Sequence, residues 1–310
     1  MTSPNPPPKR MQIANVVKGR IVKPVRLLVY GPAGVGKSTF AAAAPRPIFI
    51  GAEDGTSELD VERFPQPSAW SDVFDALHEL MTVPHDYQTV VLDTLDWLEP
   101  MCWRHVCEHA RDGKHHASIE DFGYNKGYTA ALDLWRELLA RLEELRDKRA
   151  ISVVMLAHTT IRPFQNPEGE NYDRYQMKLN PQAAMLVREW ADAVFFAFYE
   201  TYTHEQKNGK TKGVSTGARM LGTQYAAAYE AKNRYELPER IPLDWPSFAD
   251  AMAQRRTALM QALEAELARA PADIQERVRK KLVTVASDDL TQIKRITIHL
   301  AARTTTATST

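Results

Sequence analysis

The sequence predicts an α/β fold, in which a mainly parallel, twisted sheet is covered by helices on both faces. Three observations predict this class. A glycine-rich phosphate-binding motif stands between an apolar run and a helix-like segment. Apolar runs alternate with amphipathic stretches along the chain. Polar residues suited to chemistry follow several of these runs, at the edge of the sheet where ligands bind in such folds.

The phosphate-binding motif fits the P-loop pattern of a glycine, four residues and then Gly-Lys-Ser. The run 25–30 before it predicts a buried strand, and residues 39–44 predict the start of a helix. Backbone N–H groups would surround the phosphates, Lys37 would reach the β- and γ-phosphates, and Ser38 would hold Mg²⁺. A chance match in a glycine-rich turn is the alternative. The motif predicts that a nucleoside triphosphate is bound by Gly31, Pro32, Ala33, Gly34, Val35, Gly36, Lys37, Ser38 and Thr39.

The remaining elements follow from periodicity. Further strands are expected at 47–53, 89–93, 151–158 and 191–199. The clearest helix covers 128–148, with an apolar face of Leu132, Trp135, Leu138, Leu139, Leu142 and Leu145. A turn signal at 207–210 and the segment 218–232 predict antiparallel strands that continue the sheet. Helices are expected at 247–269, 272–284 and 288–301, with Pro271 and Ser287 as breaks.

These elements predict four parts of the chain. Residues 1–10 are rich in proline and are expected to be disordered, as is the Thr/Ser-rich tail 303–310. Residues 11–250 would form the ATPase core, and 251–302 a small helical C-terminal module.

Composition narrows the function classes. Thirty-nine basic and thirty-nine acidic residues cancel, so any contact with nucleic acid must come from a local patch. No apolar run approaches the roughly 20 residues of a membrane span, and the start lacks the apolar core of a signal peptide, which predicts a cytoplasmic protein. The two cysteines, Cys102 and Cys107, lie near several histidines, but their spacing matches no familiar zinc site, and plain helix residues are favoured.

Polar residues at the expected strand ends predict the chemistry. Asp93 follows Val90-Val91-Leu92, as in a Walker B strand, and would orient Mg²⁺ together with Ser38; a helix-capping aspartate is the alternative. Thr94 stands where AAA+ ATPases commonly place the water-activating glutamate, so the base must lie elsewhere. If strand 47–53 lies next to the P-loop strand, Glu53 faces the γ-phosphate and could orient the attacking water. The alternative is a solvated loop acid.

His158 ends a strand expected beside that of Asp93. A neutral histidine there could hydrogen-bond a phosphate oxygen and pass the presence of the γ-phosphate to the following loop. A structural histidine is the alternative. The chemistry is expected to converge at Gly31, Glu53, Asp93 and His158.

Together these elements resemble the RecA-type recombinase fold. Phe49-Ile50-Gly51-Ala52-Glu53 resembles the strand that ends in the catalytic glutamate, and Leu156-Ala157-His158 stands where RecA has a glutamine switch. The greatest resemblance, over about residues 20–245, is to phage-encoded RecA-like ATPases, including Sak-type single-strand annealing proteins. It implies an ATPase of phage recombination in the bacterial host cytoplasm, stimulated by DNA or by assembly into a ring or filament. A single-strand-binding protein is a further candidate partner.

The resemblance also implies DNA-binding loops at 111–126 and 162–178. The candidate contacts are Lys114, Lys126, Arg162, Phe164, Tyr172, Arg174, Tyr175 and Lys178. Aromatic side chains would stack on bases while basic ones meet phosphates. The formal charge of the second loop is zero, which argues against a DNA groove, and a long loop ordered by a neighbouring subunit is the alternative.

Ala231-Lys232-Asn233-Arg234 is similar to the Lys-Asn-Lys of RecA, so Lys232 and Arg234 are candidate catalytic residues acting across a subunit interface. An exposed basic pair at a strand end is the alternative. Two other functions stay open: a helicase-like motor or loader in phage replication, and, less favoured, a small-molecule kinase.

Overall fold

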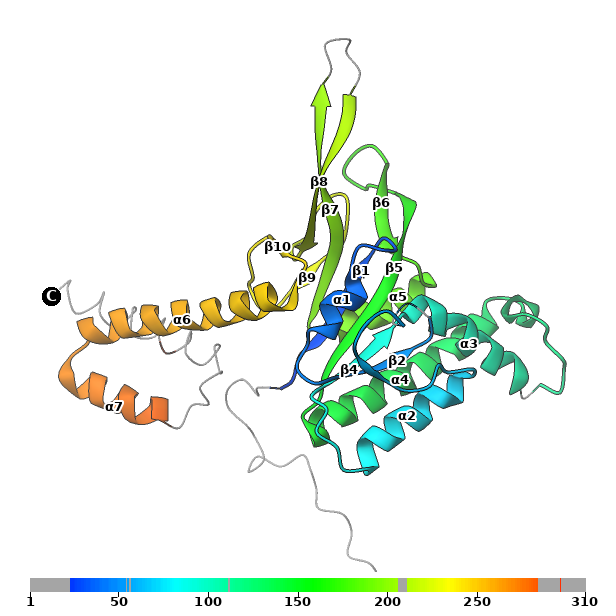
Figure 1. Ribbon diagram of the computed structural model, residues 1–310, viewed down its shortest axis with the longest axis horizontal. Helices are drawn as coiled ribbons and strands as arrows, with labels where there is room; N and C mark the ends of the chain where they lie inside the picture. The colour runs from blue at the N-terminus through cyan, green and yellow to red at the C-terminus, as the bar shows by residue number, and fades with distance from the viewer. Residues whose placement is uncertain are drawn as a thin grey trace, which may run out of the picture. The chain divides into compact units, whose positions relative to one another are not determined.

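The computed structural model describes residues 23–53, 55, 57–110, 112–205, 211–283 and 296, without the side chains of residues 202–215, 273 and 281–283 (Figure 1). The expectations for the two termini, for the turn 207–210 and, apart from residue 296, for the helix 288–301 lie outside the described residues. Residues 23–253 form one compact unit, and the residues from 254 onward belong to a second.

The first unit contains a sheet whose strand order is β10-β8-β7-β1-β5-β4-β2-β3. The P-loop strand β1 pairs in parallel with β5 and β7, and β5, β4, β2 and β3 continue in parallel. Strands β6, β8, β9 and β10 pair antiparallel. The predicted mainly parallel sheet is therefore confirmed. The bounds are β1 Arg26–Gly31, β2 Pro47–Gly51, β3 Glu62–Arg63, β4 Thr89–Asp93, β5 Ser152–Phe164, β6 Tyr172–Met177, β7 Ala193–Glu205, β8 Thr211–Gly222, β9 Lys232–Asn233 and β10 Arg240–Pro242.

Helices cover both faces of this sheet, as the alternating pattern predicts. Successive side chains of β1 point to opposite faces, so Leu28 and Tyr30 enter one core while Leu27 and Val29 enter the other. The first core also contains residues of α2 (Trp70–Thr82), α3 (Leu95–Glu108), α4 (Lys126–Arg149) and α5 (Pro181–Trp190). The second contains residues of α1 (Lys37–Ala42) and the first turns of α6 (Trp245–Arg269).

Helix α4 supplies the largest apolar stripe of the first core. It spans two residues more at its start and one more at its end than the predicted 128–148. Trp135 is buried on it and contacts Trp70 of α2, with ring centroids 5.5 Å apart. Burying a side chain of this size stabilises a fold by about 2–3 kcal/mol. The predicted face is buried as expected, except that Leu132 is only partly buried.

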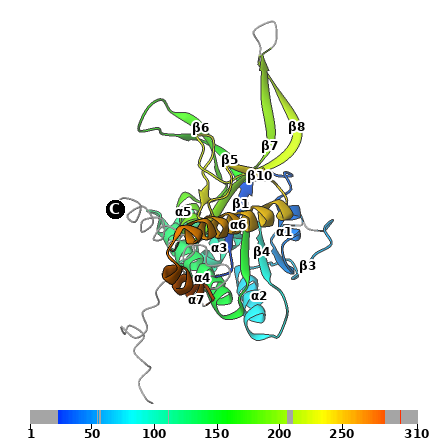
Figure 2. The same cartoon turned by 90° about the vertical axis from the view of Figure 1, so that its left-hand side faces the viewer.

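Two hairpins extend from the edge of the sheet at which β1 ends (Figures 1 and 2). One is β7–β8, whose strands pair antiparallel as predicted. The other is β5–β6, where β5 continues past His158 and pairs with β6 from Thr159↔Met177 to Phe164↔Tyr172. The expectation of a loop over 162–178 is therefore wrong for most of that segment. The polar sequence concealed these strands because they depend on pairing with each other.

The order of the sheet also shows that the condition stated for the strand of Glu53 is not met. Strand β2 lies beside β4 and is separated from β1 by β4 and β5, so it is not next to the P-loop strand. The expectation that the strand ending in His158 lies beside that of Asp93 is confirmed, because β4 pairs with β5.

In the second unit, the later turns of α6 pack against α7 (Ala272–Val283). Leu263, Leu267 and Ala270 form the buried centre, with Ile274 and Val278 against it. Within the described residues, no helix has the length and apolar character needed to cross a membrane.

Candidate functional site

The phosphate-binding loop joins β1 to α1, as the sequence predicts. Two of its glycines, Gly34 and Gly36, have φ of 74° and 106°, a left-handed conformation that favours glycine. Gly31 is required for another reason, since a Cβ there would lie 2.2 Å from the carbonyl oxygen of Ala197 in β7. The loop thus depends on glycine at three positions, as expected of a loop whose backbone N–H groups surround phosphates.

Lys37 and Ser38 lie at the start of α1 with the geometry of a triphosphate site. The Lys37 Nζ donates to the carbonyl oxygens of Gly31 and Pro32, at 3.1 and 3.0 Å. The Ser38 hydroxyl donates to a carboxylate oxygen of Asp93 at 2.6 Å. A hydroxyl and a carboxylate this close are hard oxygen ligands of the kind Mg²⁺ prefers. Ser38 and Asp93 therefore fit a magnesium ion.

Glu53 also lies near the P-loop, although its strand, β2, is not next to the P-loop strand β1. Its strand β2 ends at Gly51 beside β4, and the backbone N–H of Ala52 donates to the Asp93 carbonyl oxygen at 2.8 Å. The chain then turns toward the P-loop, and one Glu53 carboxylate oxygen lies 3.9 Å from Nε2 of His158. Glu53 and Lys37 line one cavity, on the same edge of the sheet.

His158 lies in the middle of β5, directly opposite Gly31 in the parallel register, so the expectation that His158 ends its strand is wrong. Its backbone N–H and its Nδ1 contact the two carboxylate oxygens of Asp96, at 2.8 and 3.0 Å. With Asp96 ionised, Nδ1 carries the proton. A neutral ring would then present the Nε2 lone pair to the cavity, whereas the imidazolium would present an N–H to a phosphate oxygen. The Asp96 carboxylate holds the ring in this orientation, and its negative charge would stabilise the imidazolium form of His158.

Burial dominates the electrostatics of these groups. Burial lowers the pKa of Lys37, although the charges of Asp93, Asp96 and Glu53 partly offset it. Burial raises the pKa of Asp93 despite the hydrogen bond from Ser38, and the charge of Glu53 adds to the rise. Burial also acts to raise the pKa of Asp96, but hydrogen bonds from His158 outweigh it and the net pKa is lowered. A polyphosphate beside Lys37 and a divalent cation beside Asp93 would favour the charged form of each.

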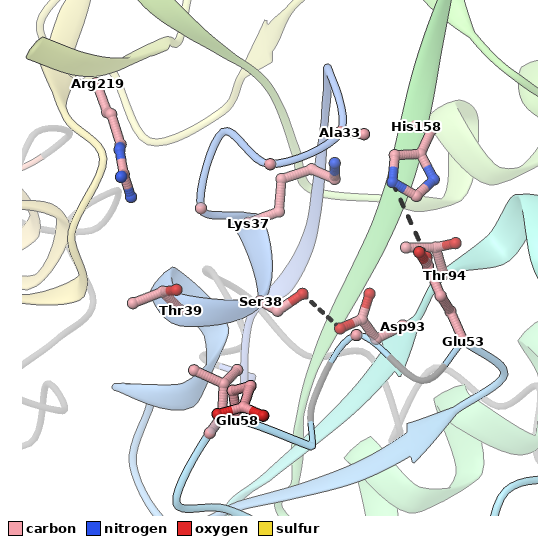
Figure 3. Close-up of a pocket in the computed structure, with 14 residues that line it drawn as sticks. Ala33, Lys37, Ser38, Thr39, Glu53, Glu58, Asp93, Thr94, His158 and Arg219 are labelled. Atoms are coloured by element: carbon pink, nitrogen blue, oxygen red, sulfur yellow. Dashed lines mark hydrogen bonds and ion pairs between the residues drawn. The ribbon is translucent and has the colours of Figure 1, made fainter. Parts of the chain in front are cut away.

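Lys37, Ser38, Glu53, Asp93 and His158 line one cavity of about 330 Å³ (Figure 3). Its lining includes Ala33, Gly34, Gly36 and Thr39 of the P-loop segment together with Glu53, Asp93 and His158. The lining residues that were not anticipated include Glu58 and Arg219. Figure 3 shows Arg219 on the opposite side of Lys37 from His158. The cavity therefore brings Glu53, Asp93 and His158 to the P-loop and adds an arginine from β8, while Gly31 lies opposite His158 without lining the cavity.

The first DNA candidate segment forms a loop, a short 3₁₀ turn (Ile119–Phe122) and the start of α4. Lys114 and Lys126 are exposed on it. His116 is buried, stacks on Phe122 with centroids 3.7 Å apart, and shapes the loop. Tyr124 was not anticipated: it is 99% exposed and has a positive φ of 46°. The Tyr124 ring, which lies between Lys114 and Lys126 in the sequence, is thus exposed enough to contact another molecule.

The second candidate segment is the β5–β6 hairpin, and its residues have different exposures. Lys178 is exposed, while Arg162, Phe164, Tyr172 and Tyr175 are partly buried. Arg174 is only 2% exposed. It donates to the Tyr229 carbonyl oxygen at 3.1 Å and pairs with Glu230 at 3.5 Å. Arg174 thus anchors the hairpin to the body of the protein, and a role for it in DNA contact finds no support in this placement.

Lys232 and Arg234 lie at the other edge of the sheet from the cavity, where β9 pairs with the start of β7. The Lys232 Nζ donates to the carbonyl oxygens of Arg188, Glu189 and Ala191 at the end of α5. Arg234 pairs with Asp192 at 3.1 Å. Both cations therefore have structural partners within the chain, and action on another subunit's nucleotide would require them to leave these partners.

The cysteines fit the structural interpretation. Cys102 of α3 is buried in the first hydrophobic core, Cys107 is partly buried, and neither forms a disulfide. Among the described residues, no group of three or more histidine, cysteine, aspartate or glutamate side chains could hold a metal ion.

Similarity to known proteins agrees with the site. The family model for the AAA domain matches residues 23–235, a range that includes the P-loop, Glu53, Asp93 and His158. No protein with a curated description matches the chain. Among solved structures, the crystal structure of the RadB recombinase is similar at 13% identity, covering 72% of this chain and 89% of that chain, with a TM-score of 0.39. This chain belongs to the AAA domain family of P-loop ATPases.

Proposed function

We propose that this protein hydrolyses ATP with Mg²⁺ and couples the reaction to single-stranded DNA in phage recombination or annealing. The observation that supports hydrolysis is the convergence of Lys37, Ser38, Glu53, Asp93 and His158 on one cavity. Bound Mg²⁺, held by Ser38 and Asp93, would offset charge on the β- and γ-phosphates.

Glu53 is the proposed base. Its carboxylate orients a water molecule and accepts its proton while the water oxygen bonds to the γ-phosphorus and the bond to the β–γ bridging oxygen breaks. Lys37 compensates the charge that develops on the leaving diphosphate. His158, in its imidazolium form opposite Asp96, donates from Nε2 to a γ-phosphate oxygen. The roles divide the cavity into a binding part at the P-loop and a reacting part at Glu53 and His158.

The proposed link to DNA runs through β5. His158 directly precedes Thr159, where the β5–β6 hairpin begins, and its carbonyl oxygen accepts from Lys178 N–H at 2.9 Å. A phosphate that moves His158 therefore moves both strands at the base of the hairpin. The segment with Lys114, Tyr124 and Lys126 supplies exposed aromatic and basic side chains, the two kinds that bind the bases and phosphates of single-stranded nucleic acid.

ATP hydrolysis measured with and without single-stranded DNA, for the wild type and Lys37→Ala, tests the proposal. We expect DNA to stimulate the wild type and the variant to lose hydrolysis. Indifference to DNA together with activation by a protein would favour a motor or loader, and phosphate transfer to a metabolite would establish a kinase. Sedimentation with and without ATP and DNA tests assembly into a ring or filament, and the same measurement with a single-strand-binding protein tests that partner.

Two lysines at opposite ends of α4 give a matched pair for the DNA surface. Lys126 begins the helix beside Tyr124, and Lys148 lies in its last turn, paired with Glu144. Lys126→Ala should weaken binding to single-stranded DNA and flatten its salt dependence, because a phosphate contact is lost. Lys148→Ala should leave both unchanged. Equal effects of the two substitutions would remove this segment from the proposed DNA surface.

A further inference from the structure

Arg219 of β8 lines the nucleotide cavity from the side away from the reacting residues (Figure 3). Its guanidinium lies against the P-loop backbone, since a Cβ at Gly36 would be 2.9 Å from its terminal nitrogen. The side chain is exposed, and it has no hydrogen bond or ion pair to any other residue that the structure describes. It is a cation held at a phosphate-binding loop with its donors available.

The backbone of Arg219 is fixed from both sides. It pairs with Tyr199 of β7, and its carbonyl oxygen accepts from the Leu243 N–H at 2.9 Å. Tyr199 itself contacts the P-loop, because its hydroxyl donates to the Gly34 carbonyl oxygen at 2.8 Å. Two cross-strand neighbours of the β7–β8 hairpin therefore meet two residues of the P-loop, which sets where the guanidinium can reach.

The position along the cavity indicates which part of a nucleotide Arg219 would meet. The P-loop backbone surrounds the α- and β-phosphates, while its lysine reaches toward the γ-phosphate. Glu53 and His158 lie at that γ end, on the other side of Lys37 from Arg219. The guanidinium, beside Gly36, faces the α- and β-phosphates, which are common to ATP and ADP.

We propose that Arg219 is a nucleotide-binding residue that holds the α/β-phosphate part of ATP and ADP alike, with Tyr199 as its positioning residue. This inference rests on the proposed nucleotide function of the same cavity. Because the arginine belongs to the same chain as the P-loop, its contribution needs no second subunit. It strengthens binding of substrate and product equally and leaves the reacting geometry to Glu53 and His158.

Equilibrium binding of ATP and ADP to the full chain tests the inference, with hydrolysis measured in parallel. A charge-assisted hydrogen bond is lost in Arg219→Ala, so affinity for both nucleotides should fall by the same factor, about tenfold or more, with kcat nearly unchanged. Arg219→Lys should recover part of the loss, and Tyr199→Phe should weaken binding by a smaller factor. The factors by which these substitutions weaken nucleotide binding should not depend on protein concentration, because Arg219 acts within its own chain.

Arg136→Ala is the matched control, because Arg136 is exposed on α4 and forms a salt bridge with Asp133 of the same helix. Unchanged affinity in Arg219→Ala, or a loss confined to ATP, would overturn the inference while Lys37→Ala still shows that the cavity binds nucleotide. If the wild type binds neither nucleotide, or if Lys37→Ala binds both as well as the wild type does, the proposed function and the inference fail together.

Discussion

Glu99 of α3 gives a prediction whose magnitude can be worked out from the structure. Its side chain lies one turn after Asp96 and is 5% exposed, and both of its carboxylate oxygens accept from the backbone N–H of Asn180, at 2.9 and 3.0 Å. Burial raises its pKa to about 7 from 4.5; that hydrogen bond and the charge of Arg162 lower the pKa, and the charge of Asp96 raises it further. Asp96 and Glu99 thus hold the two ends of the β5–β6 hairpin segment, at His158 and Asn180.

A raised folded-state pKa means that the folded protein keeps a proton which the unfolded chain loses above about pH 4.5. The stabilising effect of the protonated form is complete below that pH and is lost as the pH rises toward 7. A difference of about 2.5 pKa units corresponds to about 3 kcal/mol in total, of which about 2.5 kcal/mol falls between pH 5 and pH 8. Glutamine imitates the protonated acid and does not titrate.

Urea unfolding of the wild type and Glu99→Gln at pH 5 and pH 8 measures this difference. The variant should gain about 2.5 kcal/mol in free energy of unfolding relative to the wild type over that range. Glu108→Gln is the control, since Glu108 is exposed on the same helix. An unchanged difference between Glu99→Gln and the wild type at the two pH values would refute the reasoning.

Two further predictions concern the frame of the cavity. Gly31→Ala should lower the free energy of unfolding by about 3 kcal/mol in a denaturant titration, because its Cβ would overlap the Ala197 carbonyl oxygen; stability within 0.5 kcal/mol of the wild type would contradict this contact. Asp96→Asn should lower kcat by about tenfold or more with little change in nucleotide affinity, because His158 loses the counter-charge of its imidazolium form; a loss of affinity with unchanged kcat would show that Asp96 acts on binding instead.

The sequence was informative where the signal is local. The P-loop and the strand that ends at Asp93 are contiguous patterns, and α4 has a long apolar stripe, so each was found close to its true bounds. The strand predicted over 151–158 was found at its start only, because β5 continues to Phe164 by pairing with β6. The order of the sheet is not local information. The sequence therefore did not determine which strand lies next to β2. In the structure β2 ends at Gly51 beside β4, and Glu53, two residues later, lines the cavity.

Residues whose importance depends on distant partners were missed. Asp96 and Glu99 read as ordinary helix acids until β5 and the start of α5 are placed beside them. Arg219 reads as a strand residue until β8 is placed over the P-loop. Arg174 shows the converse, since its basic character in a polar segment suggested DNA contact, while the fold buries it against Tyr229. The spacing of residues along the sequence does not predict any of these long-range contacts.

Glutamine substitution of Glu53, compared with the same change at Glu58, most directly tests whether the cavity hydrolyses ATP with Glu53 as base. Both carboxylates line the cavity, but only Glu53 lies 3.9 Å from His158. Glu53→Gln should bind ATP as tightly as the wild type and hydrolyse it about 10² to 10⁴ times more slowly, with Glu58→Gln within a few fold of the wild type. Normal hydrolysis by Glu53→Gln, or a comparable loss in Glu58→Gln alone, would contradict the account.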